Sequence, residues 1–175
     1  FPELCLTAYT CSDLFLQESL LREAKKELKR ILQASKSKDM ILFVGMPWMH
    51  KGKLYNVAAV LNRGRILGIV PKKHLPNYSE FYELRHFNPG MEKVEMTDWE
   101  GVQVPMGMNL LFACRTMPEL VLAAELCEDV WVPCPPSISH ALAGATVIAN
   151  CSASDETTGK DQYRYNLICG QSARL

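Results

Sequence analysis

Residues 122–131 read "LAAELCEDVW", a largely apolar run that ends at a thiol, Cys127, and continues with two acids. A short apolar run of this kind is typical of a strand buried inside an α/β fold. The acids that follow, Glu128 and Asp129, oppose formation of the thiolate, which is the reactive form of cysteine. Cys127 is therefore either an inert core residue or a nucleophile that is activated by a group elsewhere in the chain.

The rest of the chain predicts further strands with few polar alternations and one long helix. Apolar residues recur at helical spacing from 18 to 35, and we interpret the basic opposite face as solvent-exposed. Ser12 and Asp13 are expected to cap this helix. A hairpin is predicted within 55–75, around the turn 62–64. The remaining expectations are strands at 1–6, 40–48, 109–115, 119–126 and 145–154, and a short helix around 139–143. This pattern indicates an α/β domain with a sheet buried on both faces.

The composition excludes several classes of function. The 175 residues are 48% hydrophobic and 22% charged, which suits one globular domain or a large piece of one. Basic and acidic residues number 19 each, so nothing indicates a nucleic-acid partner, and no apolar run is long enough to span a bilayer. Seven cysteines without a C-x-x-C pair predict neither a metal site nor a disulfide framework, as expected for a protein of the reducing cytoplasm.

Two further ionisable residues lie at the ends of expected strands: Glu3 ends the first strand, and Lys72 follows the hairpin. Taken singly, each has an ordinary explanation: a paired carboxylate, a surface cation and, for Cys127, a packed thiol. Together they are chemically coherent, because Glu3 can accept the thiol proton while Lys72 holds that carboxylate and stabilises an oxyanion. The backbone N–H of Glu128 is expected to be a second oxyanion donor, with the side chains of Glu128 and Asp129 pointing outward along an extended chain.

The order of Glu3, Lys72 and Cys127 on three strand ends resembles the carbon–nitrogen hydrolase (nitrilase) superfamily. The flanking sequence narrows the resemblance to the glutamine-hydrolysing domains of glutamine-dependent NAD synthetases, through "FPELCLTAYTC" (1–11), "VPKKHLPNYSEFYELRHFNPG" (70–90), "ELCEDVW" (125–131) and "NCSASDETTGK" (150–160). Four long motifs in order cover nearly the whole chain and are far more specific than the triad alone. One departure is Ala8, where the family pattern has glycine. It should matter little unless this position needs a positive φ.

This resemblance implies an αββα four-layer sandwich, of which residues 1–175 form part of a carbon–nitrogen hydrolase domain. It also implies hydrolysis of the side-chain amide of L-glutamine through a thioester on Cys127, with Glu3 as the base, to supply ammonia for NAD formation. The residues that bind glutamine would, by motif match, be Tyr9, Tyr78, Glu128, Ser154 and Lys160.

A second carboxylate close to Lys72 is also implied, and both Glu80 and Glu83 lie at a suitable place in the sequence. The implied partners are a synthetase domain of the same chain, which would bind ATP and magnesium, and further copies of the nitrilase fold in a homo-oligomer. No glycine- and serine-rich pyrophosphate loop occurs in this segment, so the segment itself is expected to need no cofactor. The chain reads as clipped at both ends, with "CGQSARL" (169–175) as the start of an element.

Three alternatives remain open from the sequence. A stand-alone amidase or nitrilase acting on another small amide or nitrile would share the triad, and Ser154 and Lys160 are the residues that distinguish it from a glutaminase. A non-catalytic scaffold domain would have no use for an intact Glu3, Lys72 and Cys127. A redox role is disfavoured because Cys127 has no resolving cysteine near it in sequence.

Overall fold

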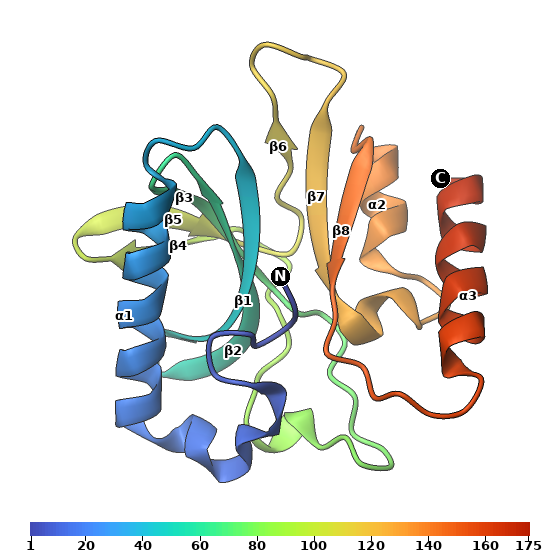
Figure 1. Ribbon diagram of the computed structural model, residues 1–175, viewed down its shortest axis with the longest axis horizontal. Helices are drawn as coiled ribbons and strands as arrows, with labels where there is room; N and C mark the ends of the chain where they lie inside the picture. The colour runs from blue at the N-terminus through green and yellow to red at the C-terminus, as the bar shows by residue number, and fades with distance from the viewer.

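The computed structural model describes all residues, 1–175, and contains two β-sheets packed face to face between helices (Figure 1). The five-stranded sheet has the order β1–β2–β3–β5–β4 and the three-stranded sheet the order β6–β7–β8. The strands are β1 (Ile41–His50), β2 (Lys53–Asn62), β3 (Arg65–Pro71), β4 (Glu95–Trp99), β5 (Val102–Met106), β6 (Phe112–Ala113), β7 (Val121–Leu126) and β8 (Val147–Cys151). Helix α1 (Glu18–Ser35) lies outside the larger sheet, and α2 (Pro136–Leu142) and α3 (Lys160–Arg174) lie outside the smaller one. The αββα fold class predicted from the sequence is confirmed.

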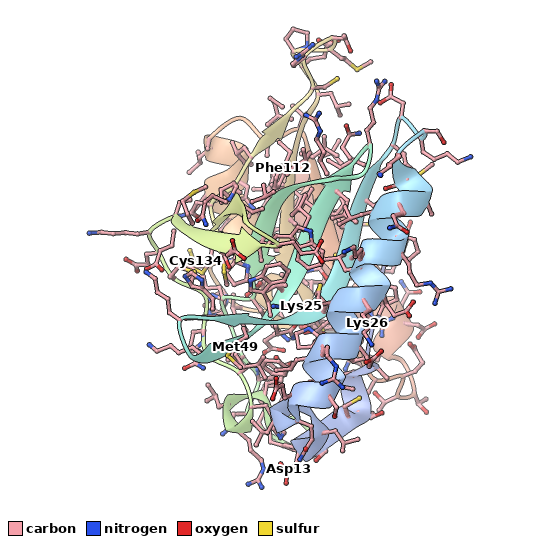
Figure 2. The ribbon with its side chains drawn as sticks, turned by 90° about the vertical axis from the view of Figure 1, so that its left-hand side faces the viewer. Asp13, Lys25, Lys26, Met49, Phe112 and Cys134 are labelled. Atoms are coloured by element: carbon pink, nitrogen blue, oxygen red, sulfur yellow. The ribbon has the colours of Figure 1, made fainter.

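Helix α1 forms because its apolar residues make one continuous stripe. Ala24, Leu28 and Leu32 are buried against the outer face of β1 and β2, in the largest core cluster of the protein. Figure 2 shows α1 along the outer face of the larger sheet, where Lys25 lies 5.8 Å above the ring of Trp48. The predicted helix 18–35 is therefore confirmed.

A second core lies between the two sheets. Ala58 and Val60 of β2 face Ala124 and Leu126 of β7 across the sandwich, and further apolar side chains of β3, β6 and β8 complete the cluster. Small side chains at these facing positions allow the sheets to pack closely. As a result, the ends of β3 and β7, with the residues that follow them, lie close together at one end of the sandwich (Figure 1).

The predicted strand at 1–6 is wrong, because this segment is a turn that runs beside β1. It is held by hydrogen bonds from Phe1 N to Phe43 O (2.8 Å) and from Leu6 N to Gly45 O (3.2 Å). Gly45 makes this contact possible, since a Cβ at this position would lie 2.3 Å from the carbonyl oxygen of Pro2. The close approach fixes the position of Glu3 at the edge of the sheet.

The predicted caps of α1 are also wrong. The helix begins after Gln17 without a side-chain cap, because Ser12 and Asp13 lie within a preceding 3₁₀ segment, η1 (Tyr9–Leu16). Asp13 instead accepts hydrogen bonds from Arg85 (2.7 Å) and His86 (2.9 Å).

The other sequence predictions differ in detail. The hairpin is confirmed as β2 and β3 joined by a turn with positive φ at Arg63 and Gly64, whereas the strand at 109–115 shrinks to Phe112–Ala113. The hairpin β4–β5 and helix α3 were not predicted, and residues 169–174, expected to begin an element, are the last turns of α3. No helix combines the length and the apolar character needed to cross a bilayer.

Candidate active site

Lys72 follows β3 directly and lies at the centre of a buried ionic cluster. Its Nζ is 2.6 Å from Oε1 of Glu3 and 2.6 Å from Oε1 of Glu83. Its side chain is fully buried and that of Glu3 is 1% exposed. Burial opposes the ammonium, but the neighbouring Glu3 and Glu83 carboxylates outweigh it and raise the pKa of Lys72 above its ordinary value. Lys72 is therefore a permanent cation, and two of its three N–H groups are used by carboxylates.

The second carboxylate near the lysine is Glu83 and not Glu80. Glu83 opens the short 3₁₀ helix η2 (Glu83–Arg85), is 5% exposed, and also accepts a hydrogen bond from the Tyr9 hydroxyl at 2.8 Å. Burial raises the pKa of Glu83, Lys72 opposes this shift, and the nearby Glu3 adds to it. Glu80 lines a neighbouring cavity instead.

Cys127 lies where β7 ends and the 3₁₀ helix η3 (Cys127–Val130) begins, with a backbone φ of +42°. A left-handed conformation is unusual for a residue with a Cβ, and such conformations cluster at functional sites. The thiol is 7% exposed, and burial together with Glu3 raises its pKa to about 12, while Lys72 opposes the rise. The charges of Glu3 and Lys72 thus act on Cys127, and the resting thiol is protonated at neutral pH.

The acids after Cys127 do not point outward along an extended chain, which corrects the sequence prediction. Asp129 is 1% exposed, because η3 turns its carboxylate back onto the backbone N–H groups of Leu126 (3.0 Å) and His74 (2.8 Å). The side chain of Glu128 accepts a hydrogen bond from the Tyr78 hydroxyl at 2.9 Å and faces a cavity. Asp129 therefore connects η3, the turn that begins at Cys127, to the loop that follows Lys72.

A cavity of about 220 Å³ opens beside Cys127. All five residues that the sequence suggested for substrate binding line it, together with Glu83 and the aromatic rings of Phe81 and Trp131: they are Tyr9, Tyr78, Glu128, Ser154 and Lys160. The structure thus brings together side chains from five separate stretches of the chain. Their individual roles remain predictions.

Lys160 and Tyr78, which both line this cavity, interact with neighbouring acidic side chains. Lys160 forms an ion pair with Asp155, and its Nζ lies 5.6 Å from the ring centroid of Trp131. Burial, followed by the hydrogen bond to Glu128, raises the pKa of Tyr78 to about 12. Lys160 and Glu128 therefore place opposite charges on the same small cavity, in addition to Glu83, whose carboxylate is already paired with Lys72.

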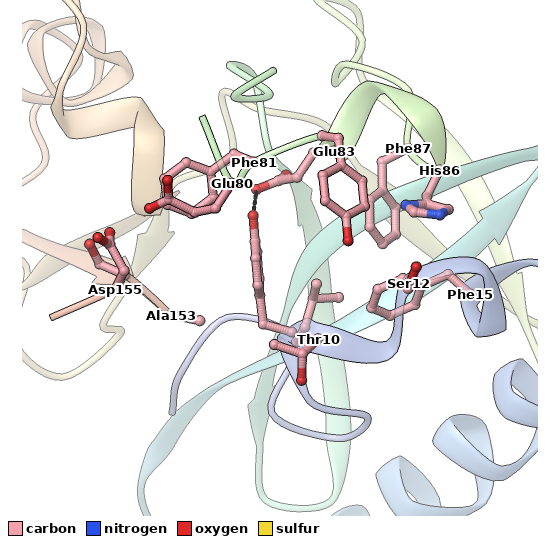
Figure 3. Close-up of a pocket in the computed structure, with 14 residues that line it drawn as sticks. Thr10, Ser12, Phe15, Glu80, Phe81, Glu83, His86, Phe87, Ala153 and Asp155 are labelled. Carbon is pink, nitrogen blue, oxygen red and sulfur yellow. Dashed lines mark hydrogen bonds between the residues drawn. The ribbon is translucent and has the colours of Figure 1, made fainter. Parts of the chain in front are cut away.

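A second cavity, of about 310 Å³, has Glu80, Phe81 and Asp155 among its lining residues (Figure 3). It shares Tyr9, Phe81, Glu83 and Ser154 with the first cavity, and the dashed line in Figure 3 marks the hydrogen bond between Tyr9 and Glu83. This wall of two aromatic rings and one carboxylate separates the two cavities.

Sequence reasoning missed two buried polar residues of the site. Asn56 lies within β2 and donates a hydrogen bond to Glu3 at 2.7 Å. Asp129 accepts the backbone N–H of Leu126 and so stabilises η3, the turn that begins at Cys127. The signal for Asn56 was present, because "YNVAAVL" (55–61) places one amide in an otherwise apolar strand. No comparable signal distinguished Asp129 from Glu128, the acid that precedes it and is less buried.

An αββα sandwich with an acid, a lysine and a thiol gathered between its strand ends is the arrangement of nitrilase-type hydrolases. The chain belongs to the carbon–nitrogen hydrolase family, whose sequence profile matches residues 1–168.

Within this family, the chain is similar to glutamine-dependent NAD(+) synthetases. It is 44% identical to the Mycobacterium tuberculosis enzyme over 174 residues, covering 99% of this chain and 26% of that protein. A crystal structure of a glutamine-dependent NAD(+) synthetase from Cytophaga hutchinsonii matches 97% of this chain and 27% of its own, with a TM-score of 0.82 and 28% identity. The fold also matches a carbon-nitrogen hydrolase from Helicobacter pylori, with a TM-score of 0.67, 21% identity, and coverage of 97% of this chain and 54% of the other. The chain spans about a quarter of the length of the curated relatives it matches.

Proposed function

We propose that this chain hydrolyses the side-chain amide of L-glutamine through a covalent thioester on Cys127. The observation that carries the proposal is the fully buried cluster of Glu3, Lys72 and Glu83, whose charges act on a thiol that lines a small cavity. Uncompensated burial of such charges is costly, and a cluster of this kind beside a cysteine is typical of a catalytic site.

In the first half of the proposed reaction, the thiol proton of Cys127 passes to Glu3 as sulfur attacks the amide carbon. Lys72 retains one N–H that no carboxylate uses, and this group stabilises the oxyanion together with the backbone N–H of Glu128. Glu3 then donates its proton to the departing nitrogen, so that ammonia leaves and a γ-glutamyl thioester remains.

In the second half, water attacks the thioester and gives a proton to Glu3. The same two donors stabilise the second tetrahedral intermediate. When this intermediate collapses, glutamate is released and the proton returns from Glu3 to the sulfur of Cys127. The proton therefore moves between the same two groups in both halves, which is why a thiol with a pKa of about 12 can serve as the nucleophile.

Recognition of glutamine is proposed to depend on the charges of Glu128 and Lys160, which line the cavity. Glu128 suits the α-ammonium group, while Lys160 and Ser154 suit the α-carboxylate. Tyr9 and Tyr78 complete the walls. The similarity to glutamine-dependent NAD(+) synthetases supports this choice over another small amide or nitrile.

For the whole protein, we propose that ammonia is used for NAD formation by a synthetase domain in the same chain. This rests on the relatives, which are NAD synthetases about four times as long as this chain. ATP and magnesium would bind to that domain and not to the residues described here. A homo-oligomer built through the nitrilase-type fold and a cytoplasmic location complete the proposal.

The test uses the full-length protein with Cys127→Ala. Glutamine-dependent NAD formation should disappear, whereas formation from added ammonium salts should persist, because only the amide-cleaving step is removed. Cys134→Ala, at an exposed cysteine, is the matched control and should retain both activities. If glutamine still supports NAD formation in Cys127→Ala, the proposed nucleophile is wrong. If a panel of other amides is cleaved faster than glutamine, the proposed substrate is wrong.

A further inference from the structure

Asn56 is the only amide in the apolar centre of β2, and it contacts three members of the ionic cluster. Its Nδ2 donates to Glu3 Oε1 at 2.7 Å and to Glu83 Oε2 at 3.3 Å. Its backbone carbonyl accepts the backbone N–H of Lys72 at 2.9 Å. The residue is 1% exposed, so these contacts are shielded from water.

The other half of the Asn56 amide has no partner. Oδ1 is buried and accepts no hydrogen bond. Leaving a buried acceptor unsatisfied destabilises the folded protein, and such an atom in a native structure requires an explanation. An apolar side chain of the same size would avoid this cost, so stability alone does not account for an asparagine here.

The donors around the two carboxylates leave a single acceptor free. Glu3 Oε1 accepts from Asn56 and Lys72, and Glu83 Oε1 accepts from Lys72 and Tyr9. Glu83 Oε2 accepts the second N–H of Asn56. Glu3 Oε2 is buried and has no partner. Among the four oxygens, only this one accepts no hydrogen bond at all.

We infer that Asn56 is a positioning residue: its two N–H groups hold the carboxylates of Glu3 and Glu83 in place, and so present Glu3 Oε2, the oxygen without a partner, to the proton of the Cys127 thiol. This inference rests on the proposed function, in which Glu3 accepts that proton. Lys72 gives each carboxylate one N–H, and Asn56 gives each carboxylate a second donor, which opposes the sharing of a proton between them; a shared proton would occupy the base.

The charged and titratable groups that face this pair come from every element around it. Lys72 at the end of β3 contributes the cation, Tyr9 of η1 donates to Glu83, and Cys127 of η3 is the proton source. Asp129 of η3 accepts the backbone N–H groups of Leu126 and His74, and its charge interacts with that of Lys72. Lys72 and Asn56 are the two side chains that donate an N–H to both carboxylates, and Asn56 is the neutral one of the two.

The experiment compares Asn56→Leu with wild type in the full-length protein. The readout is the rate at which iodoacetamide alkylates Cys127, followed by peptide mass spectrometry across pH 5–10. Loss of a hydrogen bond to each carboxylate should move the acidic limb of this profile upward by about one pH unit, which lowers the alkylation rate along that limb by about tenfold. Two effects on the melting temperature oppose each other, because the unsatisfied Oδ1 is removed while the carboxylates lose two donors, so stability is measured as a separate readout. Asn62→Leu, at the other end of β2, removes an amide that donates only to the Met40 carbonyl and should leave the profile unchanged.

Two results would overturn the inference. One is an acidic limb that stays in place while the protein loses stability, because this identifies Asn56 as a structural residue only. The other is the same shift in Asn62→Leu. If Asn56→Leu does not fold, Asn56→Ala, which leaves room for water, is measured in the same way with the same two outcomes. The alkylation profile needs no substrate, so a wild-type protein that fails to hydrolyse glutamine refutes the proposed function without affecting this test.

Discussion

Replacing Ala8 with glycine should stabilise the protein. Ala8 has φ +84° and ψ +150°, a region of the backbone map that essentially only glycine occupies without strain. The sequence motif has glycine at this position in the family that the chain resembles, and the structure now shows that the position does require a positive φ. The residue is exposed, so removing its methyl group leaves no cavity in the core.

The magnitude follows from two opposing effects. A residue held in this conformation costs on the order of 1–3 kcal/mol, which glycine would recover. Glycine also gives the unfolded chain more freedom, which lowers stability by about 0.4–1 kcal/mol. The net expectation is a gain of about 1–2 kcal/mol in the free energy of unfolding, or roughly 2–8 °C in melting temperature for a domain of this size.

Urea unfolding followed by circular dichroism measures this difference directly. Ala34→Gly is the matched control, because Ala34 is an exposed alanine in the last turn of α1, and glycine there should destabilise by up to about 1 kcal/mol. The same substitution is thus expected to have opposite signs at the two sites. A loss of stability in Ala8→Gly similar to that in Ala34→Gly would refute the reasoning from backbone strain.

Three further predictions concern the site. Glu83→Gln should lower kcat for glutamine hydrolysis at least tenfold in an ammonia-release assay, because a buried ion pair with Lys72 is lost, whereas Glu80→Gln should change it less than threefold. Tyr78→Phe should raise KM about threefold to tenfold with little change in kcat, since it frees the Glu128 carboxylate without touching the thiol; an unchanged KM would contradict this. Burial raises the pKa of Asp129 to about 7, above its value near 4 in the unfolded chain, so its contribution to stability should be present below pH 4 and be lost as pH rises to about 7. Unfolding free energies at pH 5 and pH 8 should therefore differ less in Asp129→Asn than in wild type, and equal differences would refute the assignment.

Much of the fold could be predicted from the sequence because burial leaves a clear pattern. The stripe of apolar residues in α1 and the uninterrupted runs of β1, β2 and β7 follow directly from which faces are buried. The hairpin β4–β5 was missed because its residues alternate only weakly and its edge is exposed. Helix α3 was missed because no residue in it is buried, so it carries no apolar stripe to detect.

The site was predictable in its members and less so in its geometry. Glu3, Lys72 and Cys127 were expected together, and the structure places Lys72 against Glu3 with both acting on the thiol. The choice between Glu80 and Glu83 depends on how the loop after Lys72 folds back, and the local sequence does not contain that information. The burial of Asp129 likewise depends on η3 replacing an extended chain.

The central claim is that Cys127 is the nucleophile of an amide hydrolase whose substrate is glutamine. A thiol-directed diazo-ketone analogue of glutamine, incubated with the full-length protein and followed by peptide mass spectrometry, tests it most directly. We predict that the label appears on Cys127 and on none of the other six cysteines, in proportion to the loss of glutaminase activity, and that excess glutamine prevents it. Loss of activity with Cys127 unmodified, or labelling of another cysteine that glutamine blocks, would contradict the account.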